Sequence, residues 1–201
     1  MKITCENIIL DTDPRIRQKS EKVELPLNQE DKELLEALLE YVRNSTDEEI
    51  AERDNLEPAV GIAAIQVGVP KKLIAVVVPD EEGNVQEVAL ANPKIISESV
   101  QNAYLDNGEG CLSVKEVHEG HVFRHARIKV RGYDLIKDDN VTISAEGYFA
   151  IALQHEIDHL SGILFALIKT IHGKKMSWQK LFSFCFFLRY LFVIMIKEKR
   201  N

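Results

Sequence analysis

Apolar positions along the chain follow two periods, one typical of helices and one typical of strands. After Asn28, apolar residues recur at spacings of one, three and four with Glu and Lys opposite them, which predicts an amphipathic helix over 34–42. A second helical period covers 148–159 and stops at a Ser-Gly pair, a common C-terminal signal. Acidic caps and an early proline predict shorter helices at 15–19 and from 46 onward.

Strand-like patterns occupy the middle of the chain. The predicted strands are 72–78, 87–90, 94–96, 128–133 and 141–144. The first is a β-branched run that ends at Pro79, which indicates a buried strand. Asn92 and Pro93 separate the second strand from the third. The last two are joined by a polar turn at 137–140 and are expected to form a hairpin.

Composition and charge narrow the class of protein. The 201 residues are 45% hydrophobic and 28% charged, which is typical of a soluble globular domain. A formal net charge of −7 argues against a nucleic-acid surface as the main function. The first residues lack the apolar run of an export signal, so the expected compartment is the cytoplasm, where thiols stay reduced. Cys5, Cys111 and Cys185 are too few and too scattered for a disulfide framework, so each is a free thiol, a core residue or a metal ligand.

The sequence Q-H-E-I-D-H-L at 154–160 is typical of half a metal site. His155 and His159 stand four residues apart on the second predicted helix, so their imidazoles share one face and can converge on one ion. Glu156 adjoins the first histidine and can reach a water molecule beside the metal, which is the position of a general base. The alternative is an exposed helix that contains these letters by chance.

A catalytic metal usually has three protein ligands and an open position for water. His172 and Glu198 follow the helix but lie in no matching motif. Cys111 lies upstream in the polar, glycine-marked stretch 109–113, and a thiolate there would complete a Cys/His/His set. The alternative is a buried, inert thiol, which the polar flanks of Cys111 disfavour.

A third stretch, 59–66, consists of small and apolar residues and ends in an amide. Small residues permit close backbone approach, and the Gln66 side chain can donate a hydrogen bond to a developing oxyanion. By itself this stretch is weak evidence, because small apolar runs with one glutamine are common in protein cores.

Together the three stretches resemble the motifs of peptide deformylases. They are AVGIAAIQ, EGCLSV and QHEIDHL, in the order in which the family carries them. The similarity runs from about residue 9 to about residue 165, and EGCLSV is more similar to the Gram-positive form of the enzyme. Ala59 stands where the family has glycine, and Ile65 stands where it often has proline. The expected fold is α+β, with mostly antiparallel sheets packed around a central helix that carries HEIDH.

The resemblance implies a metal site and a set of catalytic groups. Cys111, His155 and His159 would bind one divalent metal, Fe2+ by analogy with the family, for which Zn2+, Ni2+ or Co2+ can substitute. Ligand chemistry alone favours zinc. Glu156 would be the general base, and the Gln66 side chain and the backbone N–H of Leu112 would hold the oxyanion.

The resemblance also implies the substrate and the reaction. The enzyme would remove the formyl group from the initiator methionine of newly made proteins and release formate. The N-formylmethionyl nascent peptide would lie as an added strand against backbone groups of Val60, Gly61 and Gly110. A transient contact with the ribosome is expected, although no direct nucleic-acid site is evident in the sequence.

Two other interpretations remain open. One is a metallopeptidase, or a deacylase of larger acyl groups, although Ile62 and Ile65 favour a tight cavity. The other is a catalytically impaired formyl-peptide binder or a membrane-tethered relative, suggested by Ala59 and by the C-terminal segment. The methyl group of Ala59 is expected to crowd a substrate, and a left-handed backbone there would cost about 1 kcal/mol. The presence of every catalytic side chain argues against an impaired relative.

Three further histidines, His118, His121 and His125, are spaced three and four apart. A helix would gather them, but the neighbouring residues are strand-like, and a strand would place His118 and His121 on opposite faces. A second metal site is therefore not expected.

The C-terminal segment has no counterpart in the family motifs. The expected domains are a peptide deformylase-like catalytic domain at 1–172 and an atypical apolar tail at 173–201. Arg189 interrupts the apolar run of the tail, at a cost of about 2.5–3.5 kcal/mol on membrane insertion scales. Three interpretations stay open: a packed or self-associating helix, membrane association, and a poorly structured, aggregation-prone tail.

Overall fold

The computed structural model describes residues 2–79, 84–116, 118 and 120–167. These residues form an α+β fold built on a five-stranded sheet of order β1-β2-β3-β6-β7, in which all neighbours are antiparallel. The strands of this sheet are β1 Gly61–Ala63, β2 Leu73–Pro79, β3 Val85–Glu98, β6 Arg127–Asp134 and β7 Asp139–Glu146. A smaller sheet pairs β4 Asn102–Ala103 with β5 Arg124–His125. The predicted fold class is confirmed.

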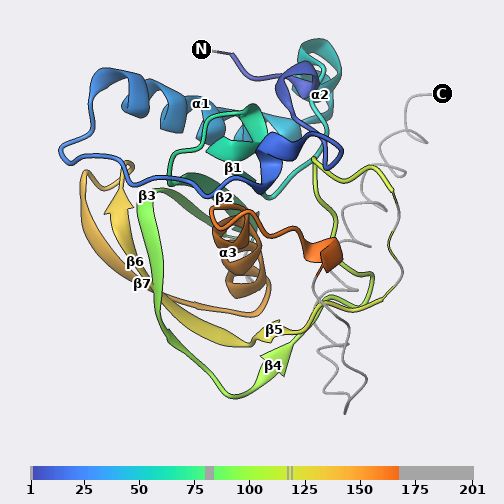
Figure 1. Cartoon of the computed structure of the whole chain (residues 1–201), viewed down its shortest axis with the longest axis vertical. Helices are drawn as coiled ribbons and strands as arrows, with labels where there is room; N and C mark the ends of the chain where they lie inside the picture. The colour runs from blue at the N-terminus through green and yellow to red at the C-terminus, as the bar shows by residue number, and fades with distance from the viewer. Residues whose placement is uncertain (1, 80–83, 117, 119, 168–201) are drawn as a thin grey trace. The chain divides into compact units, whose positions relative to one another are not determined.

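Two helices pack on opposite faces of this sheet, α1 Gln29–Ser45 and α3 Gly147–His159 (Figure 1). Leu73 and Ala75 of β2 belong to the same core cluster as the buried residues of α1. The intervening Ile74 and Val76 belong to the cluster that contains α3. Because β2 is buried on both faces, its sequence is a continuous apolar run rather than an alternating one.

The predicted helix after Asn28 is α1. The Asn28 side chain accepts a hydrogen bond of 2.9 Å from the backbone N–H of Asp31 and so caps the helix. Leu35, Leu38 and Val42 are fully buried, as the apolar stripe predicts. The acidic start near residue 46 becomes α2 Glu48–Asp54. The remaining helical segments are short 3-10 turns: η1 Cys5–Asn7, η2 Pro14–Arg17, η3 Ala64–Val67 and η4 Phe165–Leu167.

The structure differs from the sequence prediction at β3. Two short strands were expected on either side of Asn92 and Pro93, but β3 continues through them as one strand of 14 residues. The pairing with β6 shifts register between Ala91 and Lys94, and Asn92 has a left-handed φ of 53°. The Asn92 side chain exchanges two 2.9 Å hydrogen bonds with the backbone of Val23. This long-range anchor holds a bulge where local sequence indicates a strand end.

The predicted hairpin is formed by β6 and β7, whose ends extend beyond the predicted bounds to Arg127 and Glu146. The chain then enters α3 directly at Gly147, whose φ of 58° suits glycine. Ala150 and Leu153 of α3 are fully buried, so the helix that carries residues 155–159 lies in the core.

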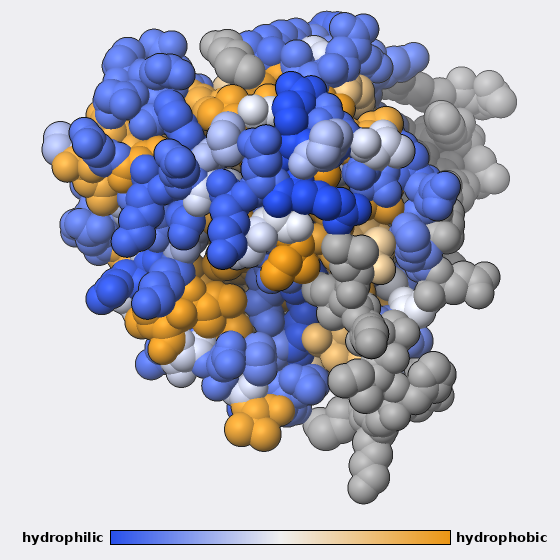
Figure 2. Space-filling model, viewed as in Figure 1, coloured by the Kyte–Doolittle hydropathy of each residue, from blue (hydrophilic) through white to orange (hydrophobic). Residues whose placement is uncertain are grey.

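Polar side chains cover most of the face shown in Figure 2, with apolar residues in separate small groups. Within the described ranges, no helix is long and apolar enough to cross a membrane. The expected domain boundary after 172 and the apolar tail at 173–201 lie outside the described residues.

Candidate metal centre

The structure brings the three predicted ligands together. The donor atoms of Cys111, His155 and His159 all lie within 4.8 Å of one another. The Cys111 Sγ is 3.3 Å from Nε2 of His159, and the two imidazole centroids are 4.9 Å apart on one side of α3. In the part of the chain that the structure describes, this is the only convergent set of three such ligand groups. One soft thiolate and two imidazoles fit a transition-metal ion such as iron or zinc.

A buried ionic network orients the first histidine. The Glu109 carboxylate lies 2.8 Å from Nδ1 of His155 and accepts hydrogen bonds from Arg124, which also donates to Asp158 at 2.8 Å. This arrangement leaves the Nε2 edge of His155 for the metal set, as partners of metal-bound histidines commonly do. Burial lowers the pKa of His155, but the hydrogen bonds that its ring donates to Cys111 and Glu109 outweigh this effect and raise the pKa to about 10. Arg124 is 5% exposed, so the network is largely shielded from water.

Three residues of this network, Glu109, Arg124 and Asp158, were not predicted from the sequence to have a role in the site. Glu109 and Asp158 lie inside the EGCLSV and QHEIDHL stretches, so these motifs could have indicated that both residues belong to the site. Arg124 gives no local signal, because it reaches Glu109 and Asp158 only through the fold.

The second histidine is neutral. His159 is 1% exposed, and burial lowers its pKa well below the ordinary value. Its Nδ1 has no hydrogen-bond partner among the described residues. A neutral imidazole is the form of histidine that binds a metal.

Glu156 is buried beside the histidines, with 4% of its surface exposed. Burial raises the pKa of its carboxyl to about 7. One of its oxygens, Oε2, has no hydrogen-bond partner among the described residues. A carboxyl group with a pKa near neutrality is able both to accept and to return a proton near pH 7.

Gln66 lies on η3, and its side chain is close to Cys111. Its Oε1 accepts a 2.8 Å hydrogen bond from the backbone N–H of Ala63. Its Nε2 lies 3.5 Å from the Cys111 Sγ and 3.3 Å from the Ser113 Oγ. Leu112, the third predicted catalytic residue, connects Cys111 to Ser113 and is 7% exposed. The structure therefore gathers the predicted catalytic residues around the thiol and the two imidazoles.

Two of the three predicted substrate-binding residues, Val60 and Gly61, lie at an edge of the large sheet. Gly61 begins β1, which is the terminal strand of the sheet and pairs with β2 along one side. The preceding carbonyl, on Val60, accepts a 2.8 Å hydrogen bond from Val77 of β2. At Gly110 an added Cβ would meet no atom within 4 Å, so space is open beside this residue.

Ala59 does not carry the backbone strain considered above. It is not among the three non-glycine residues with a left-handed φ in the described part of the chain. Its backbone N–H and C=O are both bonded to the Ser45 Oγ, at 3.1 and 3.2 Å. Helix α1 therefore fixes the position of this residue in an ordinary conformation.

The three other histidines have separate surroundings. His125 contacts the backbone carbonyl of Ser99 through Nδ1 at 2.6 Å. His121 contacts the carbonyl of Asp106 at 3.3 Å, and His118 packs edge-on against Phe165. Among the described residues, they are not part of any set of three converging ligand groups.

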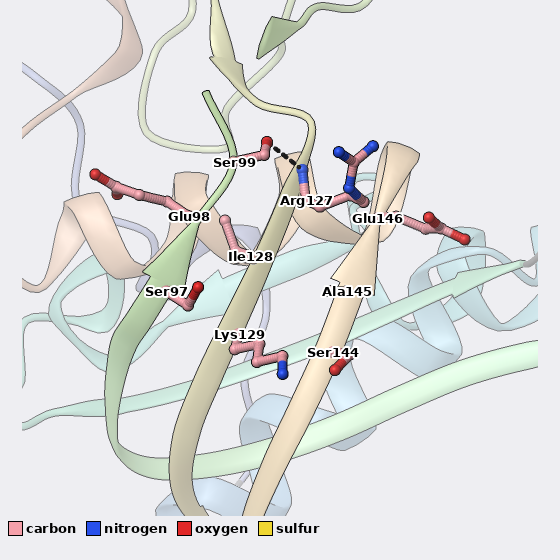
Figure 3. A pocket seen from close by; sticks show the side chains of 9 residues that line it. All are labelled: Ser97, Glu98, Ser99, Arg127, Ile128, Lys129, Ser144, Ala145 and Glu146. Carbon is pink, nitrogen blue, oxygen red and sulfur yellow. Dashed lines mark hydrogen bonds between the residues drawn. The ribbon is translucent and has the colours of Figure 1, made fainter. Parts of the chain in front are cut away.

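A hollow of about 530 Å3 lies on the large sheet, across the ends of β3, β6 and β7 (Figure 3). Its lining is mainly polar and exposed, with Ser97, Lys129 and Ser144 side by side on three strands. The backbone N–H of Arg127 donates to the Ser99 Oγ at its rim, at 3.1 Å. None of its lining residues belongs to the candidate metal set of Cys111, His155 and His159.

Comparison with known proteins identifies the family to which the chain belongs. The model of the polypeptide deformylase family matches residues 5–172. The chain belongs to the polypeptide deformylase family. Members are metalloenzymes, and the Cys111, His155 and His159 set is the candidate metal-binding group in this member of the family.

Curated relatives support the same assignment over most of the catalytic region. The chain is 47% identical over 163 residues to a peptide deformylase of Oceanobacillus iheyensis and to peptide deformylase 2 of Bacillus subtilis. Each match covers 81% of this chain and 88% of the relative. Peptide deformylase 2 of Geobacillus stearothermophilus is 49% identical over the same shares.

Solved structures of family members have the same fold. The peptide deformylase of Ehrlichia chaffeensis in complex with actinonin is 30% identical, with a TM-score of 0.68, and the match covers 100% of this chain and 99% of that one. A probable peptide deformylase from Synechococcus phage S-SSM7 is 34% identical, with a TM-score of 0.64 over 81% of this chain and 98% of that one. The resemblance inferred from the three sequence motifs is thus confirmed at the level of the family.

Proposed function

We propose that this chain hydrolyses the formyl amide of N-formylmethionyl peptides, giving formate and a free N-terminal methionine. The observation that carries the proposal is the meeting of a Cys111/His155/His159 set with the carboxyl of Glu156 and the amide of Gln66. A metal set alone fits many hydrolases. A buried carboxyl and an amide donor beside it fit amide hydrolysis through an oxyanion.

Cys111, His155 and His159 would hold one divalent ion. When bound, it supplies a Lewis acid that polarises the formyl carbonyl and makes a nearby water molecule more acidic. We assign Fe2+ on the family resemblance, with Zn2+, Ni2+ and Co2+ as substitutes. The thiolate and two imidazoles accept any of these ions, and zinc binds such a set more tightly than iron does.

Glu156 is the proposed proton carrier. It accepts a proton from the attacking water and returns it to the amine as the C–N bond breaks. Its pKa of about 7, raised by burial, suits both steps near neutral pH. The absence of a hydrogen-bond partner for Oε2 among the described residues leaves that oxygen available to the water.

The oxyanion that forms on the formyl group is assigned to two donors. Gln66 offers its side-chain amide N–H, and Leu112 offers its backbone N–H next to Cys111. Buried donors stabilise developing charge strongly, because water does not compete with them. Gln66 is 1% exposed.

The peptide chain of the substrate is assigned to the edge of β1, beside Val60, Gly61 and Gly110. An added antiparallel strand would bond to main-chain groups and so accept many peptide sequences. The substrates are then nascent N-formylmethionyl peptides in the cytoplasm, met transiently at the ribosome.

The test is anaerobic purification with metal analysis, combined with formate release from formyl-Met-Ala-Ser. We expect about one metal ion per chain and steady formate production. Glu156→Gln keeps the shape of the side chain and removes the base, so metal content should hold while turnover falls by about 10²–10⁴-fold. A Glu156→Gln variant with wild-type turnover contradicts the assignment of the base. A metallated wild-type chain that binds formyl-peptide without releasing formate would instead identify an impaired relative.

A further inference from the structure

The side-chain amide of Gln66 is held at both ends by buried groups. The backbone N–H of Ala63 donates to Oε1 at 2.8 Å, and Nε2 donates to the Ser113 Oγ at 3.3 Å. Because a backbone N–H can only donate, the atom that faces Ala63 must be the amide oxygen. The NH2 group must therefore face Ser113 and the thiol of Cys111, 3.5 Å away. A rotated amide would turn its NH2 group toward the N–H of Ala63 and lose that bond.

Ser113 also determines the direction in which the Gln66 amide donates its second hydrogen bond. The NH2 group of a glutamine carries two hydrogens, which point in different and fixed directions within the plane of the amide. Once the Ser113 Oγ accepts one of them, the direction of the other is set. That second hydrogen lies on the side of Cys111. Ser113 is fully buried, so no water replaces its hydroxyl without a rearrangement of the core.

We propose that Ser113 is a positioning residue, which aims the hydrogen bond that Gln66 donates in the active site. This inference rests on the proposed function, in which Gln66 stabilises the oxyanion. Donors aimed in advance at the developing charge need no reorganisation during the reaction. Loss of the Ser113 hydroxyl would leave the amide held only at its oxygen, by Ala63, and would leave the N–H that faces residue 113 without a partner.

A purely structural role predicts a different outcome. The backbone carbonyl of Ser113 accepts a 2.7 Å hydrogen bond from Asp11, which ties the cysteine turn to the N-terminal segment. This bond does not involve the side chain and survives substitution. If the hydroxyl served only packing or turn formation, its loss would alter stability or metal content rather than the chemical step.

The first test compares Ser113→Ala with Ser20→Ala in metal-loaded, full-length chains acting on formyl-Met-Ala-Ser. Ser20 is 5% exposed, and its Oγ has no hydrogen-bond partner among the described residues, so it offers a matched loss of a buried hydroxyl. We expect Ser113→Ala to lower kcat about tenfold, less than the 10²–10³-fold cost of removing an oxyanion donor. KM, metal content and the thiolate absorption of the Co2+-loaded protein should stay unchanged. Ser20→Ala should match the wild type in all four.

A second pair of variants distinguishes the loss of the hydroxyl from a change in packing at residue 113. Ser113→Thr and Ser113→Val introduce side chains of nearly the same shape, so any crowding is common to both. Only threonine keeps the hydroxyl. A kcat for the threonine variant several-fold above that of the valine variant supports the proposal, and equal values overturn it.

The third test asks whether Ser113 acts through Gln66. In a Gln66→Ala chain, adding Ser113→Ala should cause no further loss of kcat, because the group to be positioned is gone. Additive losses, or a loss of metal in Ser113→Ala, overturn the positioning role. A Gln66→Ala variant with normal kcat contradicts the oxyanion assignment itself. If Gln66→Ala is impaired but Ser113→Ala is not, the inference about Ser113 fails and the proposed function stands.

Discussion

Gly61 on β1 leaves the space that the Glu156 carboxylate on α3 occupies. A Cβ atom at residue 61 would stand 2.5 Å from Oε1 and 2.8 Å from Cγ of Glu156, closer than packed atoms approach. The absence of a side chain at Gly61 therefore makes room for the carboxyl of Glu156, the proposed general base. The φ of Gly61 is not left-handed, so its backbone conformation does not require glycine. The close approach of Glu156 is the reason that a side chain does not fit at this position of the AVGIAAIQ stretch.

Gly61→Ala should displace Glu156 and lower kcat by about 10²-fold or more, the contribution of a positioned general base. Metal content should stay near that of the wild type, since the ligands themselves are untouched. Stopped-flow or steady-state formate release with elemental analysis measures both. In a Glu156→Ala chain, which has room for the methyl group, Gly61→Ala should add little; a large additional loss would point to damage at the strand edge instead.

Metal affinity should increase with pH. In the metal-free protein, hydrogen bonds hold the pKa of His155 at about 10 in spite of burial. The ring is therefore protonated at neutral pH, and a metal must displace that proton. Affinity for Zn2+ should rise by up to about tenfold per pH unit between pH 6 and 9 for this proton. Competition with a chromophoric chelator across that range measures the slope.

Glu109→Gln separates the two effects of the carboxylate on His155. It removes a carboxylate that accepts a hydrogen bond from the ring, one of the two bonds that raise the pKa of His155, so the dependence of affinity on pH should become shallower. It also weakens the bond that orients the ring, so affinity at pH 9 should fall by about 10–100-fold. Glu98→Gln is a matched control, because Glu98 faces His125 at 3.3 Å on an exposed part of the sheet. Equal affinities and slopes for the wild type and Glu109→Gln would remove this network from the metal chemistry.

Site residues could be predicted from the sequence where neighbouring positions of one helix or strand determine their arrangement. A spacing of four residues on a helix places His155 and His159 on one face whatever the rest of the fold does. Arg124 bonds to Glu109 and Asp158, and the three residues lie in separate segments of the chain. The spacing of residues in the sequence does not reveal these contacts. The tertiary fold was equally necessary to show that Gly61 faces Glu156.

The fold was predictable from the same kind of local signal. The stripe of α1 and the alternation of β6 each expose one face and bury the other, so their periods are visible. β1 is short and buried throughout, and η3 is short and buried except at Val67, so neither sequence differs from that of an ordinary core segment. At Asn92, β3 is held by bonds to Val23 and Lys72, which are distant in sequence and which no local pattern reveals.

Ala59→Gly tests the departure from the family glycine. Since Ala59 has no left-handed strain, glycine relieves nothing in the folded state and adds freedom to the unfolded chain. The free energy of unfolding should fall by about 0.5–1 kcal/mol. KM for formyl-Met-Ala-Ser should fall if the methyl group crowds the peptide, with metal content unchanged. Urea unfolding and steady-state kinetics measure the two effects, and an unchanged KM would show that substrate tolerates the methyl group.

The tail at 173–201 should be dispensable for catalysis. Every proposed catalytic residue lies before Gly162, and the described core ends with Leu164 and Phe165, which are 1% and 6% exposed. A chain that ends at Gly173 should therefore keep its metal, its melting temperature and its formate release. A chain that ends at Ile163 loses both apolar side chains from the core, and losses of this size cost about 2–5 kcal/mol each.

Fractionation of the full-length chain beside the chain ending at Gly173 distinguishes the roles left for the tail. Recovery of only the full-length chain with membranes identifies a membrane anchor, and a larger species in size-exclusion chromatography identifies self-association. The shorter chain should stay in the supernatant and remain active in either case. If it is folded and metallated yet inactive, the tail helps to build the site, and a boundary after residue 172 is wrong.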